Sequence, residues 1–357
     1  MSETFGSSHA GFTHTYNIVK ALSRYVDIKL FIRGKGKPKT KFDVFCVSLP
    51  SLKIENPLKY LKSICVILRE TKEVDVIHER FHINPVDLLF VRNKKYVLEV
   101  NDPAPILYRG IKGKIYRRLI SLKFKRADVL ITQTETLKKI LSRFYRKKIY
   151  VVPNGVDMEF FRNNKNRFDV RKRFGIDKKK KIVTFVGSFR EWHGVQDIPK
   201  IAKEVNKKFK NVVFLLVGSG PLFDEVRKQK TKNMILTGPL PYEDIPAVLY
   251  QSDILIAPFN TKRFKHLEKY GFFWCPVKLY EYRVTGKPII SYDCPEIRKI
   301  VGSQGYLAKP RNLNEFIALL CECLRKCEKR AKKINVKELS WDERAKKIVE
   351  IYKKVME

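Results

Sequence analysis

The chain has 357 residues, of which 44% are hydrophobic, and it carries a formal net charge of +37. This length suits two domains of about 150 residues, each able to bury a core. No apolar run approaches the ~20 residues of a membrane span and no signal peptide opens the chain, which argues against a membrane-spanning protein and leads us to expect a cytoplasmic one.

The excess of positive charge favours polyanionic partners: nucleic acid, anionic lipid head groups or phosphorylated substrates. Dense basic runs lie in the first half, at residues 33–41, 112–126 and 138–148. The second run also contains an apolar stripe of Ile115, Leu119, Ile120 and Leu122. We favour a peripheral position on the inner face of an anionic membrane, or a phosphorylated acceptor. The alternative is that the stripe packs on a sheet and that the lysines are simply solvated.

The first half reads as strands alternating with helices. A Gly/Ser-rich stretch opens the chain and leads into a helical pattern from Tyr16 to about Tyr25. Short β-branched runs follow at Ile28–Ile32, Val44–Val47, Val74–His78, Tyr96–Val100, Asp128–Thr132 and Ile149–Val152. This alternation predicts a parallel sheet with crossover helices. The glycines of the basic loop at 33–38 open no helix, so they predict a solvated loop.

The second half repeats the pattern after a tight turn, Pro153-Asn-Gly-Val-Asp157, and a lysine-rich linker at 162–181. Its strands are expected at Ile182–Val186, Val212–Val217, Met234–Thr237, Ile254–Ala257, Ile289–Tyr292 and Tyr306–Ala308. Two such series predict an α/β protein with two Rossmann-like domains facing a central cleft. We place the domains at 1–160 and 161–339, with a terminal helix at 340–357 joining the first.

The stretch Pro276-Val-Lys-Leu-Tyr-Glu-Tyr-Arg-Val-Thr-Gly-Lys-Pro288 is the most informative. Pro276 suits the start of a helix, and Gly286 followed by Pro288 ends it. Lys278 and Glu281 are three residues apart and therefore share one helix face. A cation and a carboxylate near a helix N-terminus suit a ligand that carries both phosphate and vicinal hydroxyls. A surface ion pair is the plain alternative.

Two glycine-bearing turns follow strands of the second series. Gly187 and Gly194 bracket a strand-to-helix turn, where backbone N–H groups could meet a diphosphate. Gly218 and Gly220 lie in a Gly-x-Gly-Pro turn, which by itself is mostly an ordinary turn.

Taken in order, Pro-Asn-Gly-Val-Asp, Gly-Ser-Phe-Arg-x-Trp-His-Gly and Lys-x-x-Glu-Tyr resemble the motifs of the family-4 (group 1) retaining glycosyltransferases. The resemblance implies a GT-B fold and a nucleotide-sugar donor that serves as substrate, with no cofactor. It also implies transfer with retention of anomeric configuration. Many members carry a second acid where this chain has Phe273. Members also have a strand before the first Gly/Ser-rich turn, so the numbered chain is expected to start late or to lack that strand.

The resemblance assigns roles on the donor side. The glutamate at the position of Glu281 holds the ribose. Arg190 would neutralise the diphosphate, while His193 stands where lysine is common and could donate a hydrogen bond as a neutral imidazole. Apart from the resemblance, the cation of Lys278 is also available for the diphosphate. The glycines expected to line the donor are Gly11, in a loop pointing towards the phosphates, with Gly187, Gly218 and Gly220.

The acceptor side is less defined. Glu79 ends one predicted strand, and Asn101 and Asp102 follow another, where α/β folds place ligands. Family members carry a histidine near the position of Asn101, so Asp102, Asn101 and Glu79 are the candidates for acceptor chemistry, with caps and turns as the alternative. His14 could be a loop histidine without function.

No Asp-x-Asp motif and no cluster with zinc spacing occurs in the sequence, so we expect metal-independent catalysis. The expected partners are a nucleotide sugar and a glycan, lipid-linked or other hydroxyl acceptor. Two alternatives stay open: a nucleotide-sugar epimerase of the same fold, and a basic nucleic-acid-binding protein, which would lack any recognised reading module.

Overall fold

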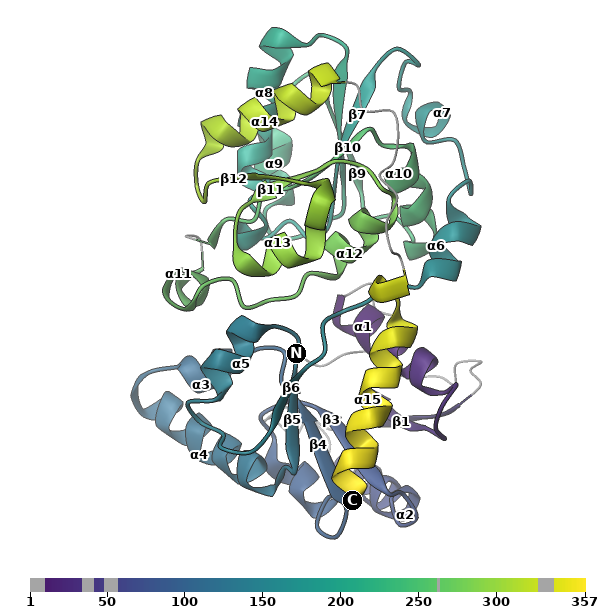
Figure 1. Ribbon diagram of the computed structural model, residues 1–357, viewed down its shortest axis with the longest axis vertical. Coiled ribbons are helices and arrows are strands. Elements are labelled where there is room, and N and C mark those ends of the chain that lie inside the picture. The colour runs from purple at the N-terminus through teal and green to yellow at the C-terminus, as the bar shows by residue number, and fades with distance from the viewer. Residues whose placement is uncertain (1–9, 34–41, 48–56, 262–263, 327–336) are drawn as a thin grey trace. The chain divides into compact units, whose positions relative to one another are not determined.

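The computed structural model describes residues 10–33, 42–47, 57–261, 264–326 and 337–357, which form two compact units (Figure 1). The first comprises 1–155, 273–275 and 340–357, and the second comprises 156–272 and 276–339. The units divide after Gly155 rather than after residue 160, because Asp157 already caps the first helix of the second unit by accepting a hydrogen bond from Phe160 N at 3.0 Å. The stretch 1–9, which bears on the expected missing strand, and the basic loop at 34–41 lie outside the described residues.

The first unit contains two parallel sheets. One pairs β1 with β2, and the other has the order β3-β4-β5-β6. The strands are β1 (Lys29–Arg33), β2 (Asp43–Val47), β3 (Val76–Arg80), β4 (Lys95–Glu99), β5 (Val129–Thr132) and β6 (Ile149–Val151). Strands β4 and β5 are almost wholly buried, as is usual for parallel strands covered on both faces.

Helices cover these sheets: α1 (Ala10–Leu22), α2 (Pro57–Glu70), α3 (Ala104–Leu107), α4 (Gly110–Arg126), α5 (Glu135–Leu141) and the terminal α15 (Trp341–Met356). Helix α15 packs on α1 and shares one apolar core with β4 and β5 (Figure 1). Its buried residues Trp341, Ala345, Ile348 and Ile351 recur every three to four positions, so one face is apolar. Among the described residues, no helix has both the length and the apolar character needed to cross a bilayer.

The second unit is one parallel sheet of order β12-β11-β10-β7-β8-β9. Its strands are β7 (Lys181–Val186), β8 (Val212–Val217), β9 (Met234–Gly238), β10 (Ile254–Ala257), β11 (Ile289–Tyr292) and β12 (Gly305–Ala308). Its helices are α6 (Met158–Asn164), α7 (Val170–Phe174), α8 (Ile198–Lys208), α9 (Phe223–Lys228), α10 (Ile245–Gln251), α11 (Lys265–Tyr270), α12 (Val277–Val284), α13 (Pro295–Val301) and α14 (Leu313–Lys326). Each predicted strand of this half is present.

Helix α12 forms where the sequence predicts it. Pro276 occupies its N-cap position, and Gly286 follows its end with a φ of 74°, which glycine adopts without strain. Tyr282 fixes the helix to the sheet, because its buried hydroxyl accepts a hydrogen bond from Val186 N, at the end of β7, at 2.7 Å. The tyrosine of the Lys-x-x-Glu-Tyr motif thus sets the position of the lysine and glutamate that precede it.

Candidate functional site

The first feature of the site is the ammonium of Lys278. Its Nζ is buried and has no hydrogen-bond partner within the described part of the chain. It lies over the rings of Phe185 at 4.4 Å and Phe259 at 5.4 Å. Burial lowers the pKa of Lys278 to about 7, partly opposed by Glu281. A buried cation without an anionic partner is costly, so this position is suited to an anionic ligand.

Gly187 leaves the space that this ammonium uses. It follows β7 with a φ of 147°, and a Cβ built on it would lie 2.2 Å from Lys278 Nζ. A side chain at residue 187 would therefore strain the backbone and displace the cation. The sequence analysis predicted that the backbone here contacts a phosphate. The structure shows in addition that the absence of a side chain at Gly187 leaves room for Lys278 Nζ at the end of β7.

Glu281 lies one helical turn after Lys278 and is 6% exposed. Burial raises the pKa of its carboxyl to about 7, although a hydrogen bond from Tyr242 and the charge of Lys278 oppose the shift. Tyr242 OH donates to Glu281 Oε1 at 2.9 Å. The predicted pair thus shares one helix face and one buried environment, and it is not a solvent-exposed ion pair.

Tyr242 is a site residue that the sequence analysis missed. It opens the short 3-10 turn η4 (Tyr242–Asp244), and its ring stacks on Phe160 with centroids 5.0 Å apart and planes 11° apart. Phe160 lies on α6, directly after the Pro-Asn-Gly-Val-Asp turn. No local pattern links residues 160, 242 and 281, because only the folded sheet brings their elements together.

Arg190 and His193 lie on the turn after β7, around the 3-10 helix η2 (Glu191–His193). The Arg190 guanidinium lies over the Trp192 ring at 5.3 Å. His193 Nδ1 lies 2.6 Å from the carbonyl oxygen of Ser188. Burial, with the charges of Lys278 and Arg190, holds the pKa of His193 well below its ordinary value. Gly194 ends the turn as predicted, with a φ of 66°.

Gly218 and Gly220 lie on the turn after β8, where Gly218 packs directly on the Gly187 loop. A Cβ on Gly218 would lie 2.0 Å from Gly187 O. The Gly-x-Gly pattern therefore allows the turns that follow β7 and β8 to approach each other, which is a packing role.

Gly11 does not lie in a loop, contrary to the sequence expectation. It is the second residue of α1, because the helix begins at Ala10 and not near Tyr16. The apolar pattern from Tyr16 onward marked the part of the helix that packs on the core, whereas the first turn carries no such signal.

Glu79 is held in a buried ionic cluster. Lys123 Nζ, on α4, lies 2.6 Å from both Glu79 Oε1 and Asp87 Oδ2, and Tyr96 OH donates to the other Glu79 oxygen. Burial raises the pKa of Glu79 despite the attraction of Lys123. Glu79, Asp87 and His82 are close enough to hold a metal ion, but the Lys123 ammonium already bonds both carboxylates. We therefore infer that the cluster stabilises the fold rather than binding a metal ion.

Asn101 and Asp102 follow β4 in two different roles. Asp102 Oδ1 accepts a hydrogen bond from Ala104 N at 2.9 Å, the local turn given above as the alternative to chemistry. Asn101 Nδ2 donates to Glu99 Oε1 at 2.6 Å, and its Oδ1 is buried with no partner within the described residues.

His14 and Glu99 form a second feature that the sequence did not reveal. His14 is buried on α1, where its Nε2 lies 2.8 Å from Glu99 Oε1 and its Nδ1 lies 2.7 Å from Asn154 Oδ1. The Nε2 distance is that of an ion pair, although its N–H direction departs from a well-aligned hydrogen bond. Burial opposes ionisation of Glu99, but the nearby His14 and His78 together hold its pKa well below the ordinary value. His14 is thus part of the core, and Asn154 of the Pro-Asn-Gly turn binds it.

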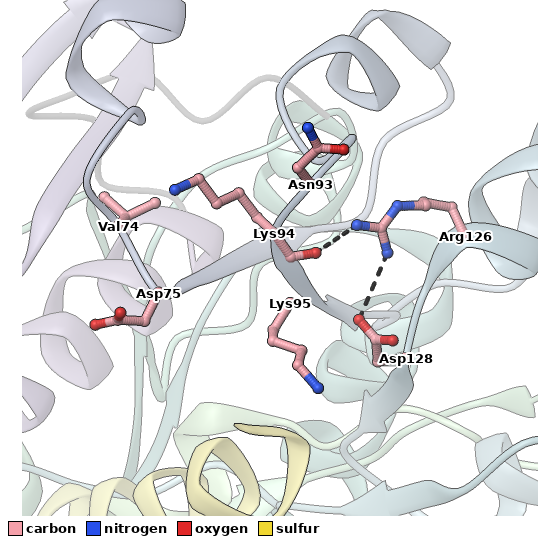
Figure 2. A pocket seen from close by; sticks show the side chains of 7 residues that line it. All are labelled: Val74, Asp75, Asn93, Lys94, Lys95, Arg126 and Asp128. Atoms are coloured by element: carbon pink, nitrogen blue, oxygen red, sulfur yellow. Dashed lines mark hydrogen bonds and ion pairs between the residues drawn. The ribbon is translucent and has the colours of Figure 1, made fainter. Parts of the chain in front are cut away.

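The first unit has a hollow of about 480 Å³, and Figure 2 shows the side chains that line it. It is lined by Val74, Asp75, Asn93, Lys94, Lys95, Arg126 and Asp128. Arg126 spans it, with an ion pair to Asp128 at 3.5 Å and a hydrogen bond to the Lys94 carbonyl. These residues lie at the amino ends of β3, β4 and β5, whereas α/β folds bind ligands at the carboxyl ends of strands. We assign it no role.

Comparisons with known proteins address the whole chain. Residues 11–160 match a family model described as Glycosyltransferase Family 4, and residues 180–326 match one described as Glycosyl transferases group 1. An uncharacterised glycosyltransferase of Methanocaldococcus jannaschii is 24% identical over 345 residues, covering 85% of this chain and 81% of that protein.

A second relative is the UDP-Gal:alpha-D-GlcNAc-diphosphoundecaprenol alpha-1,3-galactosyltransferase of Escherichia coli. It is 26% identical over 182 residues, and the match covers 48% of this chain. The chain spans 44% of that protein's length, and 43% of the length of TuaH, a Bacillus subtilis relative named for teichuronic acid biosynthesis.

Among solved structures, Anabaena Alr3699/HepE in complex with UDP and glucose aligns with a TM-score of 0.69 at 15% identity, covering 98% of both chains. This likeness confirms the predicted α/β fold of two Rossmann-like domains, of GT-B type. Neither alternative, the epimerase nor the nucleic-acid-binding protein, is favoured by these matches. The two family models lie side by side along the chain, and the structural likeness spans nearly all of it. The chain therefore belongs to the group 1, family 4 glycosyltransferases, which are transferases acting on sugars.

Proposed function

We propose that the chain moves a sugar from a nucleotide sugar, with UDP as the expected nucleotide, to a hydroxyl acceptor. The observation that carries this proposal is the buried, unpartnered ammonium of Lys278 beside Gly187, one turn before the buried carboxylate of Glu281. A diphosphate would supply the missing anion, and the ribose hydroxyls would donate to Glu281. The HepE structure named for UDP and glucose supports the choice of nucleotide.

The proposed chemistry is metal-independent and retains anomeric configuration. Lys278 and Arg190 provide positive charge where the diphosphate leaves, so the leaving group would be stabilised by fixed cations in a water-poor site. Retention is proposed from family membership. Turnover should survive EDTA, and the anomeric proton of the product should show the coupling constant of the donor's own anomer. Loss of turnover restored by Mn²⁺, or the opposite anomer, would contradict these two points.

Calorimetry with UDP, GDP and ADP tests the donor assignment. Glu281→Ala should weaken binding of the preferred nucleotide about 10- to 100-fold, because hydrogen bonds to a charged group contribute roughly 1.5–3 kcal/mol. The exposed Glu225 on α9 offers a matched control, since Glu225→Ala should leave binding unchanged. Equal affinity of wild type and Glu281→Ala for the same nucleotide would remove the assignment.

We further propose that the acceptor is lipid-linked and that the enzyme meets it at an anionic membrane. The name of the Escherichia coli relative, with its diphosphoundecaprenol acceptor, supports a lipid carrier. In α4, Ile111, Ile115 and Leu122 are exposed and share one face by their spacing, whereas Ile120 is buried. The predicted stripe is therefore divided: Ile120 packs inward as in the alternative, and Ile115 and Leu122 remain exposed.

Helix α2 shows a second exposed apolar face that the sequence analysis did not identify. Leu58, Leu61 and Leu68 are all exposed, and their spacing of three and seven residues places them on one side of the helix. Exposed lysines lie beside them, at positions 59 and 62. Apolar side chains flanked by cations suit the interface of an anionic bilayer, where each cation near the surface contributes about 1 kcal/mol.

Vesicle sedimentation tests this part of the proposal. The protein should pellet with phosphatidylglycerol vesicles at low salt, leave them as salt rises, and stay in solution with phosphatidylcholine vesicles. Leu58→Ser with Leu61→Ser should reduce pelleting, whereas Phe144→Ser, at an exposed position on neither helix, serves as the control. Equal partition to neutral vesicles, or none to anionic ones, would point to an acceptor in solution.

A further inference from the structure

His193 has a defined tautomer. Its Nδ1 lies 2.6 Å from Ser188 O and 3.1 Å from Ser188 Oγ. A carbonyl oxygen can only accept a hydrogen bond, so Nδ1 must carry the proton. The partner that fixes the ring is thus a backbone atom of the same turn, five residues earlier, and it is independent of any ligand.

The same ring is neutral. Burial disfavours the imidazolium, and the cations Lys278 and Arg190 add to this effect, so the pKa of His193 lies well below its ordinary value although the bond to Ser188 opposes the shift. Aromatic rings complete its surroundings: Phe259 from the loop after β10 at 5.6 Å, and Trp192 at 6.0 Å between ring centroids. With one proton, placed on Nδ1, the ring presents a lone pair at Nε2.

A lone pair at Nε2 changes what His193 can bind. Diphosphate oxygens are acceptors only, so Nε2 and a phosphate oxygen would repel each other. A ring in this state would not donate from Nε2 to the leaving group, which is the role that the sequence analysis expected of His193. Family members commonly carry a lysine at the position of His193. In this chain Lys278 can supply that positive charge, because its Nζ lies over the rings of Phe185 and Phe259, the two rings that His193 also contacts.

We propose that His193 Nε2 accepts a hydrogen bond from a hydroxyl group of the sugar that is being transferred. This inference rests on the proposed nucleotide-sugar donor and names the part of the donor that His193 recognises. In the proposed function, cations bind the diphosphate and the carboxylate of Glu281 binds the ribose. The remaining part of the nucleotide sugar next to the diphosphate is the sugar, and its hydroxyl groups can donate a hydrogen bond to a neutral acceptor such as Nε2. His193 is then a specificity-determining residue for the sugar.

The tautomer can be measured without any ligand. In protein labelled with ¹⁵N-histidine, the His193 signals are assigned by their loss in His193→Gln. We expect Nδ1 to show the shift of a protonated nitrogen and Nε2 that of an unprotonated one between pH 6 and 8. An Nε2–H tautomer, or an imidazolium in this range, would overturn the inference whether or not the protein binds nucleotides.

Calorimetry then tests the ligand. His193→Ala should weaken binding of UDP-glucose or UDP-galactose, whichever wild type prefers, by about 2- to 10-fold, and leave binding of UDP itself unchanged. His193→Gln, whose amide oxygen can take the place of Nε2, should recover part of the loss, whereas His193→Lys should tighten UDP without recovering the sugar nucleotide.

A deoxy analogue of the sugar nucleotide, which lacks the hydroxyl bound by His193, should bind wild type and His193→Ala with equal affinity. If His193 had only a structural role, His193→Ala would weaken binding of the analogue as well. An equal loss for UDP and for the sugar nucleotide would overturn the inference, because it would make His193 a phosphate ligand or a packing residue. If wild type bound no nucleotide at all, the proposed function would fail while the measured tautomer stood.

Discussion

Replacement of Lys278 by methionine should stabilise the ligand-free protein and abolish nucleotide binding. The folded state keeps an ammonium buried over Phe185 and Phe259, and the fall of its pKa from 10.5 to about 7 measures the cost. At ~1.4 kcal/mol per pH unit, that fall corresponds to about 4–5 kcal/mol below pH 7. Methionine has a similar length and makes favourable sulfur–aromatic contacts. We therefore expect an unfolding free energy at pH 6 about 2–4 kcal/mol above that of wild type.

The pH dependence gives the sign of the effect. The unfolded chain keeps Lys278 protonated up to about pH 10.5, whereas the folded chain releases the proton near 7, so this group makes wild type more stable as pH rises between these values. Glu281 acts in the opposite sense at lower pH: its folded pKa of about 7 makes stability fall as pH rises from about 4.5 to 7. Lys278→Met should lose the first slope and retain a slope from Glu281.

Urea unfolding at pH 6, 8 and 9.5 measures these slopes, with Lys230→Met, at an exposed position, as the matched control that keeps the wild-type dependence. Binding of UDP offers a second measurement. The bound diphosphate should raise the pKa of Lys278, so calorimetry at pH 8 in buffers of different ionisation enthalpy should show uptake of close to one proton. A variant less stable than wild type at pH 6, or UDP binding without proton uptake, would refute the reasoning.

Three further variants test the site and its support. Tyr242→Phe removes the hydrogen bond to Glu281 Oε1, so the pKa of Glu281 should rise further and UDP affinity should fall roughly 10-fold at pH 7, recovering in part at pH 9; an unchanged pH profile would contradict this. Gly187→Ala should lower UDP affinity more than it lowers the melting temperature, because the new Cβ displaces the Lys278 ammonium, and equal affinity would show that the ammonium is not needed there. Asn154→Ala should cost about 2–4 kcal/mol in urea unfolding, since it leaves buried partners on His14 and Gln133 unsatisfied, and a cost below 1 kcal/mol would assign the Pro-Asn-Gly motif a role other than packing.

The strands of the second unit could be predicted because buried parallel strands have continuous apolar sequences. Strand β8 is buried at every position and was visible as Val212–Val217. Helix α12 was equally predictable, since Pro276 and Gly286 mark its two ends. Its lysine and glutamate followed from their spacing. What the sequence could not show was their burial, because burial depends on Phe185, on β7, and on Phe259, in the loop after β10.

The acceptor-side candidates were harder to judge because carboxylates look alike in a sequence. Glu79 was expected at the end of a strand, and it lies there, but Lys123 from α4 neutralises it. Glu99, two residues before Asn101, lies near two histidines, at 2.8 Å from His14 Nε2 and 3.4 Å from His78 Nε2. Each network includes an ion pair between residues more than 40 positions apart, Glu79 with Lys123 and Glu99 with His14, which no local spacing pattern could reveal.

The positive charges at the surface and the buried charge of Lys278 have different effects. Most of its 74 Lys and Arg can only produce a diffuse field, which salt screens over about 8 Å at physiological ionic strength, and such a field attracts any polyanion alike. Lys278 is different because its Nζ is buried between aromatic rings, where screening is weak and where a ligand must fit beside Gly187 to reach it. Because the pKa of Lys278 lies near 7, its protonated and neutral forms are both populated at neutral pH, and a bound anion would favour the protonated form. In the function proposed above, the surface charge would therefore serve to attract an anionic membrane, whereas the buried Lys278 would select the anion that the site binds.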